Sequence, residues 1–222
     1  MSNTMATEAN YSADIGMFTI DRPIHSSCTH KTSYCEEHCY NDKLYNMYKN
    51  MKVKDIRNEK AWIDNDAKGL RKALDRKRKQ TIRVRLMSRG EAFSTYEDID
   101  RVENILEENP DTIFWIPTRA WRDKSLLIYS VLSRLDRFDN VRILASFDPS
   151  NTMDEWAYVK DKLGMSTMFF GNNEWKKTLN GDTMFKCPKT WKKMTGHCDT
   201  CKAGCFAQKT IGRTQIVHLS QH

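Results

Sequence analysis

The 222-residue sequence lacks any run that approaches the roughly 18 apolar residues of a transmembrane helix. Residues 1–14 are polar, without the basic and apolar segments of a secretory signal, so we expect a reducing, cytoplasmic setting. Only 9 glycines and 5 prolines are present, and there is no internal repeat or low-complexity tract, which excludes collagen-like chains. The mean hydropathy of −0.71 and the 10% aromatic content predict instead one folded, non-membrane domain, with room for a small appendage.

The net charge of +7 is unevenly distributed along the chain. Residues 176–222 hold nine of the 36 basic residues but only two of the 29 acidic ones, so this segment accounts for the whole excess. A cationic surface of this kind attracts nucleic acid or a phosphorylated substrate. The alternative is a basic surface that serves only solubility.

The seven cysteines fall into two groups and none is left over. The first group has the spacing C-x6-C-x3-C and the second has the spacing C-x10-C-x2-C-x3-C. The first comprises Cys28, Cys35 and Cys39, and the second comprises Cys187, Cys198, Cys201 and Cys205. An odd number cannot be fully paired in intramolecular disulfides, and tight spacing in a cytoplasmic chain favours metal or iron–sulfur ligation.

The two groups predict sites of different kinds. Four thiolates saturate a zinc ion or a [4Fe–4S] cluster, and the spacing does not choose between these. Unligated structural cysteines are the alternative. Three thiolates leave one iron of a cube open to a substrate or cofactor. Because His30 and His38 lie within the first run, a zinc site with three cysteines and one histidine is the competing interpretation.

Hydrophobic periodicity predicts strands that alternate with helices. Expected strands cover residues 16–24, 82–87, 112–117, 141–147, 166–170 and 216–219, and expected helices cover residues 35–50, 59–79, 95–108, 122–137 and 154–163. This alternation predicts βαβ units and a parallel sheet. Active sites of such sheets gather at the carboxyl ends of the strands. Cysteine or polar residues follow each of the first five predicted strands, which favours an enzyme over a pure binding protein.

The sequence, with its cysteine groups and its polar strand ends, resembles the radical S-adenosylmethionine (SAM) superfamily, and most closely its small phage-encoded iron–sulfur members. The similarity spans residues 15–210. It rests on a cysteine loop after the first strand that ends in Cys39-Tyr40, on Ser88 to Phe93 after the second strand, and on the turn Thr118-Arg119-Ala120-Trp121. A Cys-Pro pair followed by a C-x2-C cluster completes it. The resemblance implies a partial (β/α) barrel of about five or six parallel strands with a C-terminal cysteine-rich, cluster-binding extension.

The resemblance also implies roles for individual residues. The first three cysteines would hold a [4Fe–4S] cluster whose open iron binds SAM, and the last four would hold a second cluster. Glu91 and Arg119 would take part in catalysis. Cofactor contacts would come from Tyr40, Gly90 and Glu91, and from Ser146 or Asp148 at the ribose. Residues 1–14 would form a flexible arm, residues 15–175 the barrel core and residues 176–222 the extension.

The implied function is modification of a nucleobase, or rearrangement or trimming of a hypermodified DNA pyrimidine, in the bacterial host cytoplasm. Partners would then be SAM, a nucleotide or DNA substrate and an electron donor. Whether the enzyme is an isomerase, a lyase or a transferase stays open. The alternatives are a zinc-dependent nucleic-acid-binding protein and an iron–sulfur protein that acts without SAM.

Overall fold

The computed structural model describes the greater part of the chain. The described residues are 9–12, 16–75, 82–123, 126–171, 184–187, 190, 198, 201, 205–206 and 216–219. All seven cysteines are among them, whereas most lysines of the basic segment 176–222 lie outside. No helix in these ranges is both long and apolar enough to cross a bilayer.

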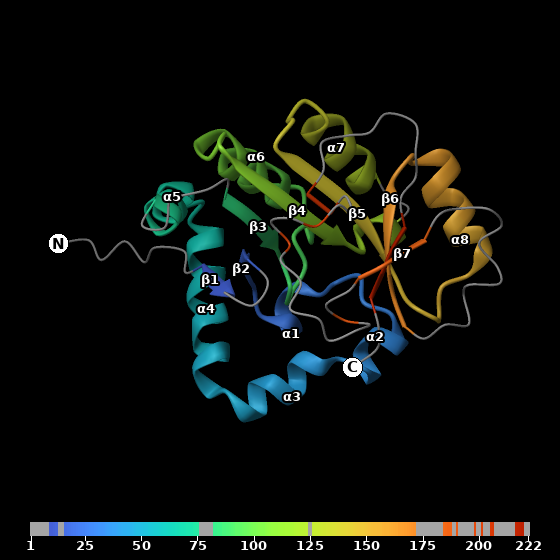
Figure 1. Ribbon diagram of the computed structural model, residues 1–222, viewed down its shortest axis with the longest axis horizontal. Coiled ribbons are helices and arrows are strands. Elements are labelled where there is room, and N and C mark those ends of the chain that lie inside the picture. Colours follow the sequence, from blue (N-terminus) through green and yellow to red (C-terminus); the bar gives the residue numbers. More distant parts are fainter. Residues whose placement is uncertain are drawn as a thin grey trace.

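The described strands form one open, mostly parallel sheet (Figure 1). Its strands are β1 (Asn10–Ser12), β2 (Met17–Ile20), β3 (Ile82–Leu86), β4 (Thr112–Thr118), β5 (Val141–Phe147), β6 (Ser166–Phe170), β7 (Met184–Lys186) and β8 (Ile216–Leu219). The order across the sheet is β1-β2-β3-β4-β5-β6-β8-β7, and only β1 runs antiparallel. From β2 to β6 each strand pairs with the next one in the chain, so the carboxyl ends of these strands meet along one edge.

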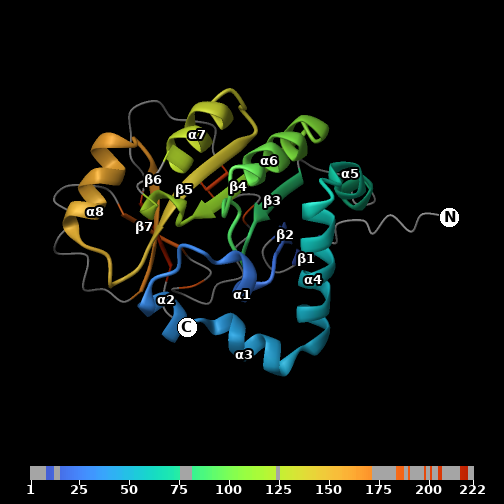
Figure 2. The same ribbon diagram turned by 180° about the vertical axis from the view of Figure 1, so that it is seen from behind.

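Helices connect the parallel strands. They are α1 (Ile24–Ser27), α2 (Ser33–Glu37), α3 (Tyr40–Met47), α4 (Lys49–Ile63), α5 (Ala67–Asp75), α6 (Glu97–Glu108), α7 (Leu126–Leu135) and α8 (Met153–Ala157), with a π-helical turn at Tyr158–Lys162. Apolar side chains of α5 to α8 share a buried core with alternate residues of the strands, so these helices cover one face of the sheet. Figure 2 shows the same arrangement from behind, with α1 and α2 together at one end of the sheet.

The other face of the sheet, here called the second face, is packed differently. A smaller core on it joins Met17, Trp115, Leu144, Met168 and Val217 to Phe206. Cys198 and Cys205 pack against the same cluster. The second cysteine group therefore lies on the face of the sheet that α6 to α8 leave uncovered.

The six predicted strands and the α/β class are confirmed, but several predicted boundaries differ from the structure. The helix predicted at 35–50 is divided among α2, α3 and α4. Asn10–Ser12 form a strand within the predicted flexible arm, because they pair with β2. The predicted basic helix at 59–79 is divided between α4 and α5, where Asn65 adopts a left-handed backbone with φ of 55°. The strands β7 and β8 belong to the main sheet, so the sheet continues past the expected core boundary at residue 175.

Candidate functional site

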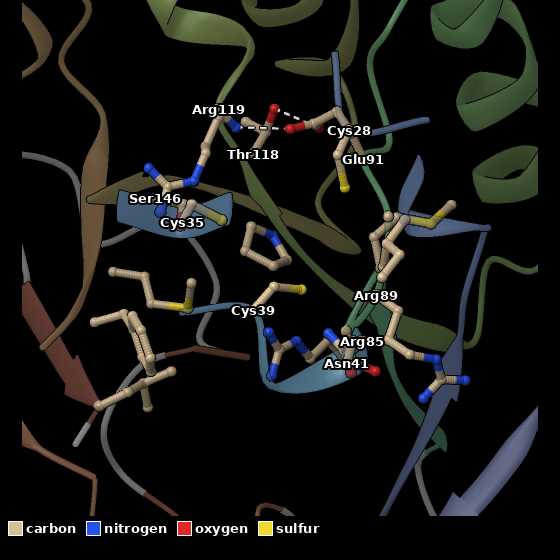
Figure 3. A pocket seen from close by; sticks show the side chains of 18 of the residues that line it. Cys28, Cys35, Cys39, Asn41, Arg85, Arg89, Glu91, Thr118, Arg119 and Ser146 are labelled. Atoms are coloured by element: carbon tan, nitrogen blue, oxygen red, sulfur yellow. Dashed lines mark hydrogen bonds between the residues drawn. The ribbon is translucent and has the colours of Figure 1, made fainter. Parts of the chain in front are cut away.

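A cavity of about 280 Å³ opens at the carboxyl ends of the strands and continues onto the second face (Figure 3). One part of its wall is the loop and helix segment that follows β2, including Cys28, Cys35 and Cys39. Another part comes from strand residues such as Arg85, Trp115 and Ser146, and a third includes Cys187 and Cys198. The cavity therefore brings together residues that are far apart in the sequence.

The first cysteine group converges on this cavity. Cys28 follows α1, Cys35 lies in α2 and Cys39 precedes α3, and Figure 3 shows the three side chains facing one space. Burial raises the pKa of the Cys28 thiol to about 12, and the charges of Glu91, Cys35 and Cys39 add to this effect. A thiol that resists ionisation by itself, as Cys28 does, suits a cation that replaces its proton.

The helix that carries Cys35 is held in place by a buried polar chain. The Thr32 side chain accepts a hydrogen bond from the Cys35 backbone N–H at 2.9 Å and donates one to Asp148 Oδ2 at 2.6 Å. Arg119 Nη1 lies 2.8 Å from the same Asp148 oxygen. Burial raises the pKa of Cys35, whereas the positive charge of Arg119 opposes that rise. Arg119 thus lines the cavity beside Cys35, while the fully buried Asp148 supports it from behind.

Glu91 joins the ends of two strands. Its Oε1 accepts hydrogen bonds from the backbone N–H groups of Ala92 and Phe93 and from the Thr118 hydroxyl at 2.7 Å. Its Oε2 accepts one from the Arg119 N–H at 2.8 Å. The carboxylate lines the cavity but is 5% exposed, and it fixes the loops after β3 and β4 relative to each other.

Gly90 occupies a position that requires glycine. Its φ is +82°, and a Cβ there would lie 2.6 Å from Ser27 Oγ and 2.8 Å from the Arg22 carbonyl oxygen. The loop after β3 therefore packs directly against α1, just before Cys28. This contact ties the expected cofactor loop to the first cysteine group.

The remaining expected cofactor contacts lie around the same cavity. Ser146, at the end of β5, is 8% exposed and lines it. Tyr40 also lines it, and its hydroxyl lies 3.4 Å from the Ser88 carbonyl oxygen. Arg89 turns away from the cavity centre in Figure 3 and pairs with Asp21 at 2.8 Å and Asp55 at 2.7 Å.

The cysteines of the second group also lie close enough to one another for their charges to interact. Burial raises the pKa of Cys198 to about 11 and that of Cys205 to about 12, and the charges of the other cysteines in this group contribute to both shifts. Arginines of the second face oppose these shifts, Arg83 and Arg85 at Cys198 and Arg142 at Cys205. Arg83 also donates a hydrogen bond to the Cys198 carbonyl oxygen.

The donor sets suit soft metal ions or iron–sulfur clusters, since both consist of thiols. Within the described ranges, no three or more His, Cys, Asp or Glu side chains lie close enough together to coordinate a single metal ion as they stand. His30 Nε2 lies 3.1 Å from the Phe93 carbonyl oxygen, and His38 Nδ1 lies 3.1 Å from the Tyr34 carbonyl oxygen. Both histidines nevertheless line the cavity.

Sequence reasoning missed Arg85, Trp115 and Asn41 as cavity residues. The alternation of basic and apolar residues in β3 places Arg83 and Arg85 together on the second face, and this was the available signal. The positions of Trp115 and Asn41 carried no comparable signal, because a tryptophan in a strand and an asparagine in a helix are usually structural.

Comparison with known proteins gives one result. No curated protein and no solved structure matches the chain. A family model described as gene product 88 matches residues 2–181, which is more than half of the sequence. The chain therefore belongs to the gene product 88 family.

Proposed function

We propose that this chain is a radical-SAM-type iron–sulfur enzyme. The observation that carries the proposal is the convergence of Cys28, Cys35 and Cys39 on a cavity at the carboxyl ends of parallel strands. The sequential order of β2 to β6 also supports a partial (β/α) barrel, because a doubly wound fold reverses its strand order at a switch point. The helices on one face and the cavity on the other agree with this geometry.

The residues at the cavity suit the proposed cofactors. The three thiols would hold a [4Fe–4S] cluster with one open iron, and Tyr40, Gly90, Glu91 and Ser146 border the space for SAM. When bound, the cluster and SAM would supply one-electron chemistry at an unactivated carbon. Apolar strand residues, including Met168 and Phe170, would keep water from the reacting groups.

The chain's own polar residues would then act mainly by orientation. Glu91 accepts four hydrogen bonds, so it would hold the loops after β3 and β4 in the geometry that binding needs. Arg119 would place a positive charge beside Cys35 and offset the negative charge of a thiolate-bound cluster. Asp148 would orient Arg119 through the 2.8 Å ion pair.

The second cysteine group would hold an auxiliary [4Fe–4S] cluster. Four thiolates leave no open coordination position, so this cluster would transfer electrons or stabilise the fold. Arg83 and Arg142 would balance its negative charge. Cys187 and Cys198 line the same cavity as the first group, which supports electron transfer between the two centres.

The proposed substrate is a nucleobase or a hypermodified DNA pyrimidine. The basic composition of residues 176–222 supports this class, and the gene product 88 family favours a phage origin. The reaction would then take place in the cytoplasm of the bacterial host. An electron donor and SAM are the other proposed partners.

Metal analysis under anaerobic conditions, followed by electron paramagnetic resonance, tests this proposal. We expect about eight irons per chain, with matching sulfide, from two four-iron clusters. After reduction with dithionite, one signal should change when SAM is added. Zinc without sulfide would contradict the proposal and would favour a nucleic-acid-binding protein. Iron and sulfide with a signal indifferent to SAM would favour an iron–sulfur protein that acts without it.

Two matched variants separate the proposed centres. Cys28→Ala should remove the SAM-responsive signal and about half of the iron, because the cluster loses one of its three cysteine ligands and is no longer held. Cys201→Ala should reduce the unresponsive signal and leave the response to SAM. Loss of both signals in a folded Cys28→Ala protein would contradict the assignment of two separate sites.

A further inference from the structure

Two buried donor groups lie side by side on the second face, with no acceptor among the described residues. Arg85 of β3 and Trp115 of β4 are direct partners in the register of the sheet. The Arg85 guanidinium carbon lies 4.6 Å from the centre of the Trp115 ring. Arg85 Nε and Trp115 Nε1 are both buried, and neither has a hydrogen-bond partner among the residues that the structure describes. Unsatisfied buried donors are rare and call for an explanation.

The other arginines that line the cavity are neutralised by carboxylates. Arg89 pairs with Asp21 and Asp55, and Arg119 pairs with Asp148. Arg85 forms no ion pair with a carboxylate of the described ranges, although its charge acts on the nearby Cys198 thiol. Figure 3 shows Arg85 reaching into the cavity, whereas Arg89 points away from it. Arg85 is thus a positive group in the cavity whose fork of donors is available to a ligand.

The surroundings of Arg85 define what such a ligand would look like. Apolar side chains form the wall beyond it on the second face, namely Met17, Pro117, Met168, Phe170 and Leu219. The cavity volume of about 280 Å³ is close to the lower end of the range for small-molecule sites. A guanidinium fork matches the geometry of a carboxylate or a phosphate, and an indole N–H adds one further donor.

We propose that Arg85, with Trp115, binds the acidic group of a small substrate, a carboxylate or a phosphate, and thereby determines substrate specificity. This inference rests on the proposed function where it concerns the reaction that the substrate undergoes. The anion site itself is inferred from the residues of the cavity alone. Arg85 lies close to the carboxyl end of β3. Along the strand it is roughly 7 Å from Met87, the residue that follows β3 and also lines the cavity. A substrate held there by its acidic end would extend along the apolar wall toward the first cysteine group.

The test uses the full chain, prepared anaerobically with its metal, and three small aromatic probes. Phenyl phosphate and benzoate carry the two acidic groups, and benzyl alcohol is the uncharged match. Binding is measured by isothermal titration calorimetry. We expect at least one of the two anions to bind at least tenfold more tightly than benzyl alcohol, and the stronger anion identifies the acidic group. Equal affinity for all three probes would overturn the inference.

Arg85→Gln should abolish the preference for the anion, while Arg137→Gln should leave it unchanged. Arg137 is a matched control because it is exposed on the helix side of the molecule, where it pairs with Glu107 at 2.9 Å. Trp115→Phe keeps the ring that packs on Phe206 and removes the donor, so it should weaken anion binding about fivefold, the effect of one hydrogen bond. Anion binding that persists in folded Arg85→Gln would overturn the inference. If Arg85→Gln fails to fold, the other two variants decide. The inference would be overturned if Trp115→Phe and Arg85→Lys both bound the anionic probe with the affinity of the wild type.

A parallel titration with SAM separates this inference from the proposed function. The electron paramagnetic resonance response to SAM should survive in Arg85→Gln, because the acidic group is assigned to the substrate. Loss of the SAM response with unchanged binding of the anionic probes would overturn that assignment. Arg85-dependent anion binding in a protein that contains zinc and no sulfide would support the anion site and contradict the proposed radical chemistry.

Discussion

At the scale of single residues, Gly90 shows most directly how local geometry shapes the site. Gly90→Ala forces a side chain into a left-handed backbone and places its Cβ 2.6 Å from Ser27 Oγ. We expect a loss of about 3 kcal/mol in the free energy of unfolding, measured by urea denaturation. Gly164→Ala is the control, because φ there is +62° but no atom of the described residues lies within 4 Å of the added Cβ. That variant should lose only about 1 kcal/mol, and equal losses would show that packing against α1 is unimportant.

Glu91 allows a second prediction at this scale. In Glu91→Gln an amide N–H₂ replaces one oxygen that now accepts hydrogen bonds, so at least one buried donor loses its acceptor. The free energy of unfolding should fall by about 2–3 kcal/mol. Glu107→Gln, which affects an exposed pair with Arg137, should change it by less than about 1 kcal/mol. A small effect of Glu91→Gln would mean that the four hydrogen bonds contribute little to holding the strand ends.

Individual partners were the least predictable part of the site. The three cysteines of the first group and Glu91, which stood out from their spacing and from a predicted strand end, all line the cavity. The ion pair of Arg119 with Asp148 and that of Arg89 with Asp55 join residues 29 and 34 positions apart, and nothing in a local pattern encodes them. Asp148 was expected at the cofactor ribose, and the structure instead buries it behind Arg119.

At the scale of elements, Asp148 connects the end of β5 to α2 and makes stability depend on pH. Burial alone would raise its pKa, but Arg119 and the hydrogen bonds from Ser150 and Thr32 outweigh burial and hold the pKa below the usual 3.8. Because the folded-state pKa is depressed, the stabilisation is complete at pH values above about 4 and is lost as the pH falls further.

Asp148→Asn should therefore be about 3 kcal/mol less stable than the wild type at pH 7, since it leaves a buried guanidinium unpaired. The difference should shrink when urea denaturation is repeated at pH 3. Asp161→Asn, at an exposed position in the π-helical turn, should match the wild type at both pH values. A difference that stays constant between pH 7 and pH 3 would contradict the assigned ion pair.

Strong periodicity made some elements predictable, and its absence hid others. The alternation in residues 82–86 predicted β3 correctly, because one fully buried face imposes a period of two. The apolar runs near residues 113 and 143 predicted β4 and β5 correctly, because both faces of these strands are largely buried. The strands β1 and β7 have three residues each, too few to establish a period. The place of β8 between β6 and β7 depends on long-range pairing that no local pattern contains.

At the scale of the whole molecule, the second cysteine group should determine the local stability of one side of the sheet. Cys198 and Cys205 pack against the core of the second face, and the chain between β7 and β8 carries all four cysteines of this group. If a metal centre forms there, removing it with a chelator should speed hydrogen exchange of the Val217 and His218 amides at least tenfold. The amide of Ile116 in β4 should be much less affected.

Cys28→Ala is the control for this experiment, since it leaves the second group intact. Its exchange rates at Val217 and His218 should equal those of the wild type. Unchanged rates at these amides after metal removal would contradict a structural contribution of the second group. Faster exchange throughout the sheet would show that the metal stabilises the whole domain rather than one side.

The position of β8 has a consequence for how the protein is made. During synthesis β8 leaves the ribosome after every other described strand, yet it lies inside the sheet, with β6 on one side and β7 on the other. The strand β7 pairs only with β8 among the described strands, so it has no place in the sheet until β8 has been translated. Until then β6 exposes an unpaired, apolar edge that invites association with other chains. Slow translation at this stage would therefore reduce the yield of protein through aggregation of nascent chains.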